Sequence, residues 1–264
     1  MNATALLSQR LHTQCLAGTP FGQPEDVVQS LLGVQSQDFP GASWSVGQRV
    51  AKGAEANVRQ EFDAGRILRT HVLRPTWHFV TPADIRWLVR FTAPRVHALN
   101  AHMYRKLELD EETFTRAHQV FGETLAGGNQ LTRAELGALL AQNGIAPAGQ
   151  RLAYIVMHAE LETLICSGAM RGKQHTYALL DERAPRARPL DGDEALAELT
   201  RRYVTGHGPT TERDLAWWAS LTLAQVRRGL DIVSAEFESV ELDGQVFWHG
   251  PDPPAPPIPP DAYL

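Results

Sequence analysis

The chain has 264 residues with a net charge of −5, 43% hydrophobic and 21% charged, an ordinary composition for a folded protein of two or three domains. Its apolar runs are far shorter than the roughly 20 residues of a bilayer span, which argues against a membrane protein. We expect a cytoplasmic protein, because the N-terminus lacks signal-peptide character and the two cysteines, Cys15 and Cys166, have neither Cys-x-x-Cys spacing nor histidine partners.

Residues 1–105 are predicted to form a first unit. A helix begins at Pro24, keeps apolar residues at helical spacing as far as Val34, and breaks at Phe39-Pro40-Gly41. Two short strands follow, flanking Arg74-Pro75 as a hairpin, and residues 81–84 cap a helix over residues 85–91.

Residues 106–184 are predicted to form a second unit. Thr132 and Glu135 make a capping box, and the helix that they open stops at Gly144. A second helix is predicted over residues 151–167. The segment after it suggests two strands around a turn near Arg171-Gly172-Lys173.

Residues 190–250 repeat this order as a third unit, after a linker at residues 184–189. Thr211 and Asp214 repeat the capping pattern, a second helix begins near Thr222, and a hairpin surrounds Asp243-Gly244. Two helices followed by a hairpin is the winged-helix arrangement. The sequence therefore predicts a mostly helical α+β fold of three tandem winged-helix units, followed by a proline-rich tail at residues 251–264.

A locally basic segment runs from Arg66 to Lys106. It holds eight arginines and lysines against Asp84 alone, so its charge is 8 − 1 = +7 before its four histidines are counted. Such a stripe can bind DNA phosphates even on an acidic protein, because affinity follows the local field. A solvated face of an amphipathic helix explains the same residues equally well.

The sequence contains no motif of a strong nucleophile, a phosphate-binding loop or a metal centre, and we expect neither cofactor nor metal. The most unusual polar segment is Gln35-Ser36-Gln37-Asp38, at the predicted end of an apolar helix. Glutamines there usually cap carbonyls or point into solvent, so the residues alone leave a structural role open. Trp44, which follows closely, is expected to pack in the core.

Three segments together resemble the AlkZ/YcaQ superfamily of bacterial winged-helix DNA glycosylases. They are Gly33-x-Gln35-x-Gln37-Asp38, the segment Leu73-Arg74-Pro75-Thr76-Trp77-His78-Phe79-Val80, and Arg201-Arg202-Tyr203 with Gly208-Pro209-Thr210-Thr211, Asp214 and Trp218. The resemblance covers nearly the whole chain. It implies a concave surface that binds double-stranded DNA, and a monofunctional hydrolase that excises alkylated purines, including bulky N7 adducts and interstrand crosslinks.

The resemblance also assigns roles to residues. The family's catalytic pattern, Gln-x-Gln or Gln-x-Asp, falls on Gln35 and Gln37, and the second Gln indicates the AlkZ-like branch. In and beside the first hairpin, Arg69, Arg74, Trp77 and His78 are expected to contact DNA or line the lesion site. Core packing of Trp77 and a backbone hydrogen bond to His78 are equally open.

Two features depart from the family pattern. Pro75 stands where the family usually has Gly, so the hairpin turn is expected to differ locally. The tail is also expected to lead to a C-terminal β-rich portion that this sequence does not contain, which puts the DNA affinity of that portion in doubt.

The proposed chemistry suits amides. A purine alkylated at N7 is already cationic and leaves as a neutral base, so the enzyme needs a positioned water rather than a strong acid. We expect a monomer acting on DNA that contains alkylated purines. The alternatives are a non-catalytic winged-helix DNA-binding protein or transcription regulator, and a binding module that has lost activity.

Overall fold

The computed structural model describes residues 2–51 and 55–251, and within them one order of elements occurs three times. Each occurrence, here called a repeat, runs helix, short strand or bridge, helix, helix and hairpin. The predicted tail at residues 251–264 lies outside the described residues, apart from Pro251.

The first repeat consists of α2 (Pro24–Ser30), β1 (Val34–Gln35), α3 (Phe39–Gly47), α4 (Glu55–Ala64), β2 (Leu68–His71) and β3 (Trp77–Val80). The second consists of α6 (Glu111–Leu125), β4 (Leu131–Thr132), α7 (Arg133–Gln142), α8 (Arg151–Leu161), β5 (Ile165–Ser167) and β6 (Thr176–Leu179). The third consists of α10 (Gly192–His207), a bridge at Thr210, α11 (Glu212–Ala219), α12 (Leu223–Val233), β7 (Glu238–Leu242) and β8 (Gln245–His249).

The sheets of the repeats share one topology. The strand orders are β1-β3-β2 and β4-β6-β5, all antiparallel, and in the third repeat Thr210 bridges Trp248 of β8 beside β7. In each repeat the last strand of the hairpin is therefore central. The elements outside this pattern are α1 (Ala3–Thr13), α5 (Ile85–Lys106), α9 (Leu180–Arg183) and a 3₁₀ turn (Ser234–Glu236).

The elements with local sequence signals form as predicted. The side chains of Thr132 and Glu135, and of Thr211 and Asp214, cap each other's backbone N–H groups in the expected boxes. Asp243 and Gly244 both have positive φ, 52° and 75°, as a two-residue hairpin turn of type I′ requires.

The predicted helix of the first repeat was wrong at its end. Helix α2 ends at Ser30, Leu32 adopts a left-handed φ of 63°, and Val34 and Gln35 pair with β3 instead of continuing a helix. Phe39-Pro40-Gly41 opens α3 rather than breaking a helix. Asp38 caps the N–H of Gly41, and Pro40 lies in the first turn, where no N–H partner is needed.

Two further boundaries differ from the prediction. The helix expected over residues 85–91 is α5, which continues through Pro94 to Lys106. The helix expected over residues 151–167 ends at Leu161. Thr163 there adopts a left-handed φ of 58°, and Ile165–Ser167 becomes strand β5.

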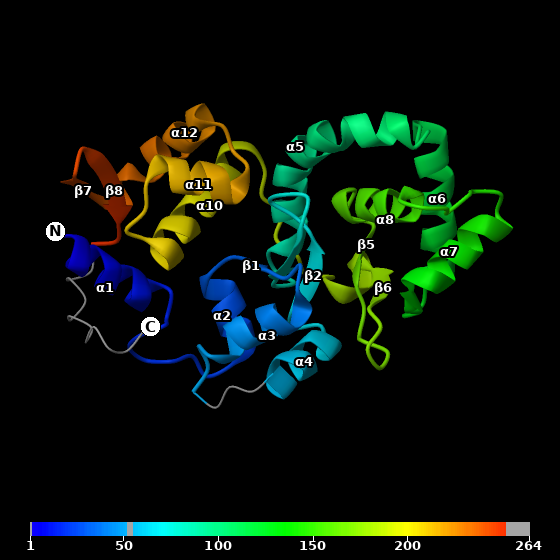
Figure 1. Ribbon diagram of the computed structural model, residues 1–264, viewed down its shortest axis with the longest axis horizontal. Coiled ribbons are helices and arrows are strands. Elements are labelled where there is room, and N and C mark those ends of the chain that lie inside the picture. The colour runs from blue at the N-terminus through cyan, green and yellow to red at the C-terminus, as the bar shows by residue number, and fades with distance from the viewer. Residues whose placement is uncertain (1, 52–54, 252–264) are drawn as a thin grey trace.

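Helix α5 connects the three repeats. The second and third repeats lie at opposite ends of the long axis with the first between them, and α5 runs from the first to the second (Figure 1). Buried residues of α5 such as Trp87, Leu88 and Val96 belong to one apolar cluster that also includes residues of β2, α8, β5, α10, α11 and α12. The first and second repeats each have a further core of their own. No helix in the described part of the chain has the length and apolarity to span a bilayer.

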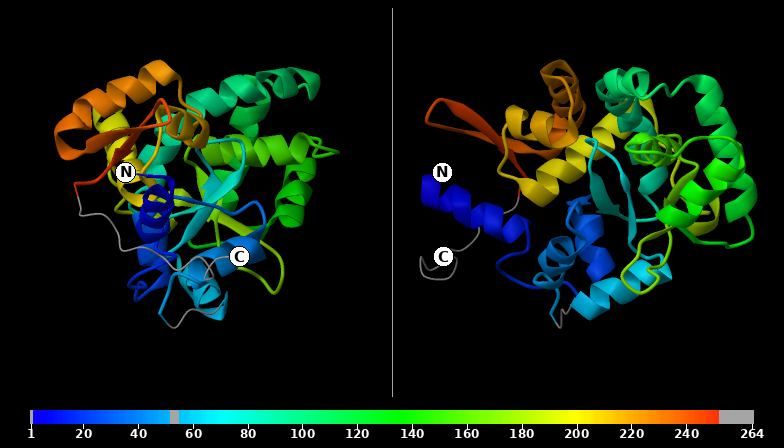
Figure 2. Two further views of the ribbon diagram at one scale, coloured as in Figure 1. Left: turned by 60° about the vertical axis from the view of Figure 1, so that its left-hand side comes forward. Right: turned by 45° about the vertical axis from the view of Figure 1, so that its right-hand side comes forward.

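Helix α1 packs on the third repeat although it opens the chain, as the views in Figure 2 show. Arg10 Nε donates to the carbonyl of Pro209 at 2.7 Å, and its guanidinium lies 5.7 Å from the ring centroid of Phe247. Thr13 Oγ1 donates to the carbonyl of Gly208. The N-terminal residues are therefore part of the third repeat in space.

The third repeat contacts the first at Gly206 of α10. A Cβ at this position would lie 2.6 Å from the carbonyl oxygen of Ser30, at the end of α2. The side chain of Arg202, one turn earlier, donates to the carbonyl of Gln29. A glycine is thus required for this contact between two backbones.

Gly206→Ala is expected to destabilise the protein by about 1–3 kcal/mol, because the added methyl overpacks a backbone contact that has no flexible side chain to yield. Gly122→Ala is the matched control. Gly122 is also inside a helix, its Cβ would meet nothing within 4 Å, and the change should stabilise by up to about 1 kcal/mol. Denaturant unfolding of both variants measures the difference, and equal stabilities would contradict the packing argument.

Candidate functional site

The two predicted catalytic amides flank the buried Ser36, at and just after the end of strand β1. Gln35 ends β1 opposite His78 of β3, and Gln37 follows two residues later. Both glutamines are exposed, whereas Ser36 between them is fully buried. Residues two apart in an extended chain point to the same side, so the amides need no helix turn to come together.

Hydrogen bonds on both sides hold this segment in place. The N–H of Ser36 donates to the carbonyl of Trp77 at 2.8 Å, and Arg69 Nε donates to the carbonyl of Ser36 at 3.0 Å. The N–H of Trp77 donates to Gln37 Oε1 at a longer 3.4 Å. The backbone between the two amides is therefore fixed, and Gln37 Oε1 keeps a lone pair for another donor.

Among the residues expected to touch DNA, Arg69 and Trp77 lie together. Arg69 is 7% exposed, and its guanidinium carbon is 4.3 Å from the ring centroid of Trp77. Burial is the main cause that lowers the pKa of Arg69. Trp77 is half-buried, with its ring centroid 4.3 Å from that of His71, so it is neither a core residue nor a free platform.

His78 points into the protein and does not line the cavity, and its expected place at the lesion site stays a prediction. It is 1% exposed, and its Nδ1 contacts the carbonyl of Thr76 at 3.0 Å, which is the open alternative of a backbone hydrogen bond. Its Nε2 is buried and has no hydrogen-bond partner among the described residues. Burial lowers the pKa of His78 to about 4, so the ring is neutral at pH 7.

Arg74 faces the third repeat. Its guanidinium lies 4.5 Å from the ring centroid of Trp217 on α11, and burial lowers its pKa. Trp217 is 71% exposed, and Trp44 on α3 is 67% exposed. The expectation that Trp44 packs in the core was therefore wrong, and two large aromatic rings stand at the surface.

A cavity of about 630 Å³ opens between the first and second repeats, beside Gln37. The first repeat contributes Gln37, Arg69 and Trp77 to its wall. The second repeat contributes Thr132, Arg133, Ala134, Leu152, Gln174, His175 and Tyr177. Three predicted residues thus meet at one cavity, whereas Gln35, Arg74 and His78 do not line it. This wall contains two guanidinium groups and no carboxylate.

The residues that the second repeat contributes to the cavity wall were not predicted from the sequence. Arg133 is the first residue of α7, between the two members of the capping box, so the box could have drawn attention to it. His175 and Tyr177 carry no comparable signal. Burial and the nearby Arg69 and Arg59 lower the pKa of His175 to about 4, and burial raises the pKa of Tyr177, so both are neutral at pH 7.

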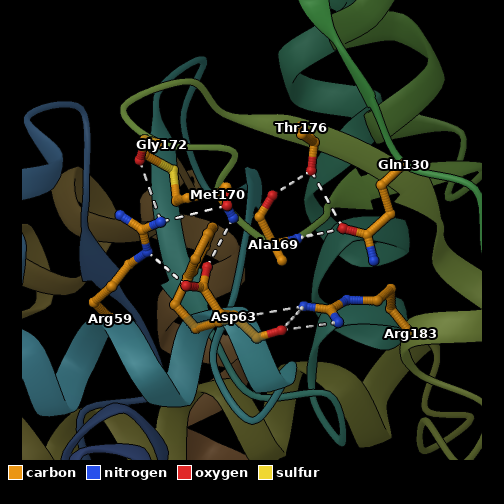
Figure 3. Close-up of polar contacts among 9 residues, drawn as sticks. Arg59, Asp63, Gln130, Ala169, Met170, Gly172, Thr176 and Arg183 are labelled. Atoms are coloured by element: carbon orange, nitrogen blue, oxygen red, sulfur yellow. Dashed lines mark hydrogen bonds and ion pairs between the residues drawn. The ribbon is translucent and has the colours of Figure 1, made fainter.

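A seam of polar contacts also joins the first and second repeats (Figure 3). Asp63 of α4 accepts from the N–H of Met170 at 2.7 Å and from Arg59 Nε at 2.7 Å. Arg183 Nη2 donates to the carbonyl of Phe62 at 3.1 Å. Gln130 in turn accepts from the N–H of Ala169. The hairpin loop of the second repeat is thereby tied to α4.

The basic segment does not form one continuous surface. Arg66 is paired with Glu61 and Glu25, Arg86 with Asp181, and Arg69 is buried. The basic residues exposed along α5 are Arg90, Arg95, Arg105 and Lys106. The available positive charge is therefore divided between α5 and the cavity wall.

Comparisons with known proteins point to one family. Residues 28–263 match the family described as DNA glycosylase AlkZ-like. The chain is 24% identical over 251 residues to the interstrand DNA cross-link repair glycosylase of Streptomyces sahachiroi. That alignment covers 89% of this chain and 66% of the relative, so this chain spans just under two thirds of the relative's length.

A solved structure has the same fold. The DNA glycosylase AlkZ of Streptomyces sahachiroi aligns with a TM-score of 0.79 and 23% identity, covering 95% of this chain and 71% of that chain.

The buried neutral His78 is expected to make stability depend on pH. Its folded-state pKa of about 4 lies below the ordinary value, so unfolding takes up a proton between these pH values. The free energy of unfolding is therefore unaffected by the titration of this histidine above about pH 6.5. Below that pH it falls by roughly 1.4 kcal/mol per pH unit toward pH 4. Urea unfolding across this range should give a shallower pH slope for His78→Asn than for the wild type, and identical slopes would contradict the burial of a neutral ring.

Proposed function

The chain belongs to the AlkZ-like DNA glycosylase family, and from this we propose that it hydrolyses the N-glycosidic bond of cationic N7- or N3-alkylated purines in double-stranded DNA. The observation that carries the proposal is the exposed pair Gln35 and Gln37 on a segment held by backbone hydrogen bonds, with Gln37 at the wall of the cavity. We infer a monofunctional hydrolase in DNA repair that acts as a monomer and needs no cofactor.

Neutral amides match this reaction because the substrate is already activated. An alkylated, cationic purine departs as a neutral base, so the difficult charge in the transition state is the positive charge on the sugar. An amide oxygen can accept a hydrogen bond from the attacking water and direct its dipole at that charge. Gln37 Oε1, which holds one long contact from Trp77, has the capacity for this water.

The charge of the cavity wall favours the DNA backbone over the cationic base. Arg69 and Arg133 attract phosphate and repel a positive purine, and the wall has no carboxylate to compensate. The dipole of α7, whose N-terminus lies at this wall, also favours an anion, although the Glu135 carboxylate of the capping box already occupies part of that end. We propose that a phosphate near the lesion binds to Arg133 in the cavity wall. The sugar would then lie at the edge of the cavity, within reach of the glutamine amides.

The three repeats support a DNA-binding role. Their helix-strand-helix-helix-hairpin order and shared sheet topology lead us to infer three winged-helix units arranged around a concave DNA-binding surface. We propose that Arg74 and Trp217, which stack on each other, and the exposed Trp44 contact DNA at this surface.

Exposure of the amides bears on the size of the lesion. Gln35 and Gln37 lie at the surface and not in an enclosed pocket, so a bulky substituent on the purine has room to project into solvent. We therefore include bulky adducts and interstrand crosslinks in the proposed substrate range. The relative in Streptomyces sahachiroi, whose name gives crosslink repair, supports this extension.

The Gln35→Ala, Gln37→Ala double variant is expected to lose base release by about 100-fold or more, as removal of positioned polar groups does in other active sites. Its affinity for the same DNA should stay within about twofold. Mass detection of free 7-methylguanine and 3-methyladenine from methylated duplex measures release. Gln60→Ala, which removes an exposed glutamine from α4 of the same repeat, is the matched control.

The outcomes of this experiment separate the functions. A fully active double variant would show that the amides are not catalytic. A wild-type protein that binds damaged DNA without releasing any base, even in excess, would favour a non-catalytic DNA-binding protein.

Arg133→Gln is expected to weaken DNA binding and to reduce the slope of log affinity against log salt by about one, because one phosphate contact is lost. Base release at saturating enzyme should change little. Arg116→Gln, on the exposed side of α6 in the same repeat, should leave the slope unchanged. Titrations by fluorescence anisotropy at several salt concentrations test this, and an unchanged slope for Arg133→Gln would remove it from the DNA contact.

A further inference from the structure

Metal-ligating side chains gather where α5 and α8 meet, away from Gln35 and Gln37, whose surroundings are here called the amide site. One ligand atom comes from each of three residues: His97 of α5, His158 of α8, and Glu162, the C-cap of α8. These atoms lie within 4.8 Å of one another. We propose that this cluster, here called the histidine cluster, binds one divalent transition-metal ion such as Zn²⁺. Bound there, the ion would join the connecting helix α5 to the second repeat.

Helix geometry places the ligands on facing surfaces. His158 and Glu162 are four residues apart, so their side chains lie on the same face of α8. Helix α5 packs against α8, and His97 Nε2 is 3.1 Å from Glu162 Oε1. The ligands therefore come from two helices, with His97 more than 60 positions before the other two, and no local sequence spacing predicts them.

The distances suit a small ion. Two donors bound to one Zn²⁺ at about 2.0–2.2 Å, with a tetrahedral angle between them, lie roughly 3.4 Å apart. The His97–Glu162 separation of 3.1 Å is close to this value. With His158, whose ligand atom lies within 4.8 Å of the other two, the ion would have three protein ligands and a fourth position for water.

The imidazoles have the outer hydrogen bonds that metal-binding histidines commonly have. His97 Nδ1 contacts Tyr104 Oη at 3.0 Å, and His158 Nδ1 contacts His118 Nε2 at 3.2 Å. A tyrosine hydroxyl can accept as well as donate, so Tyr104 permits the tautomer of His97 that leaves the Nε2 lone pair free. The ring of Phe114 stacks on His158 with centroids 3.6 Å apart, which limits its rotation.

The charges around the cluster are compatible with a cation. Glu162 supplies negative charge and is half-exposed. A cavity of about 300 Å³ lined by His97, Glu162 and Arg90 gives access to the cluster, although Arg90 opposes a cation there.

A metal-free explanation exists for the closest contact. His97 Nε2 lies 3.1 Å from Glu162 Oε1 without hydrogen-bond geometry in the described structure. A small ring rotation would let a neutral His97 donate from Nε2–H to Glu162 while Tyr104 donates to its Nδ1. This explanation predicts no effect of metal on the protein, so metal addition distinguishes it from the proposal.

The test uses the full chain without a histidine tag, stripped with chelator and titrated with Zn²⁺ alone. Calorimetry should give one Zn²⁺ per chain, and free Zn²⁺ at a hundredfold excess over the Kd should raise the Tm by about 5 °C. Co²⁺ bound at the same place should give the visible absorption of a low-coordinate site with nitrogen ligands. Both signals should disappear in His158→Gln.

Two variants guard against misfolding and binding elsewhere. Glu162→Gln changes a half-exposed residue, so it should keep the Tm of the metal-free wild type and still weaken Zn²⁺ binding at least tenfold. His102→Gln, an exposed histidine on the same α5, should bind Zn²⁺ like the wild type. No binding by the wild type at micromolar Zn²⁺, or binding unchanged in both cluster variants, would overturn the proposal.

Discussion

A buried histidine–carboxylate contact joins the two repeats that form the amide site. His71 of β2 and Glu160 of α8 are 3% and 1% exposed, and His71 Nδ1 lies 2.5 Å from Glu160 Oε2. Removing one partner would leave a buried polar or charged group uncompensated, at a cost of several kcal/mol. The contact thereby fixes β2 against the second repeat, and beside it the N–H of Arg69 donates to Ser167 Oγ. Because Arg69 and Trp77 line the cavity from one side and Tyr177 from the other, its shape depends on this register.

A second buried carboxylate plays the same part at the other end of the first repeat. Asp84, 2% exposed, accepts from Thr81 Oγ1 and Trp87 Nε1 and pairs with Arg202 Nη1 of α10 at 2.7 Å. The first repeat is thus held on both sides by ionisable side chains in an apolar setting, where their geometry is demanding. These contacts favour a fixed angle between repeats over a flexible chain of domains, which would suit the proposed binding to a DNA duplex.

Much of the fold could be predicted because its signals are local. A capping box such as Thr132 with Glu135, or a turn such as Asp243-Gly244, stabilises its own segment and needs no distant partner. The wrong predictions concern segments whose structure depends on residues far away in the sequence. Val34 and Gln35 are strand only because β3 pairs with them, and Pro94 is tolerated inside α5, a helix buried against all three repeats. The cavity wall from Arg133, His175 and Tyr177 could not be predicted, since it exists only when two repeats meet.

The same reasoning explains why the amide pair, once proposed as catalytic, implies narrow chemistry. The ionisable groups nearest to it in the described structure are already engaged. Asp38 caps α3, Arg69 is bonded to the carbonyl of Ser36, and His78 is neutral and turned inward. None of them stands ready to protonate a departing base. A purine that needs protonation to leave would therefore gain little here, whereas one that already carries a positive charge needs only water, position and a dipole. On this proposal, selectivity for damaged bases has two sources. One is that no acid beside Gln35 and Gln37 in the described structure stands ready to protonate a normal base, and the other is the pair of amides itself.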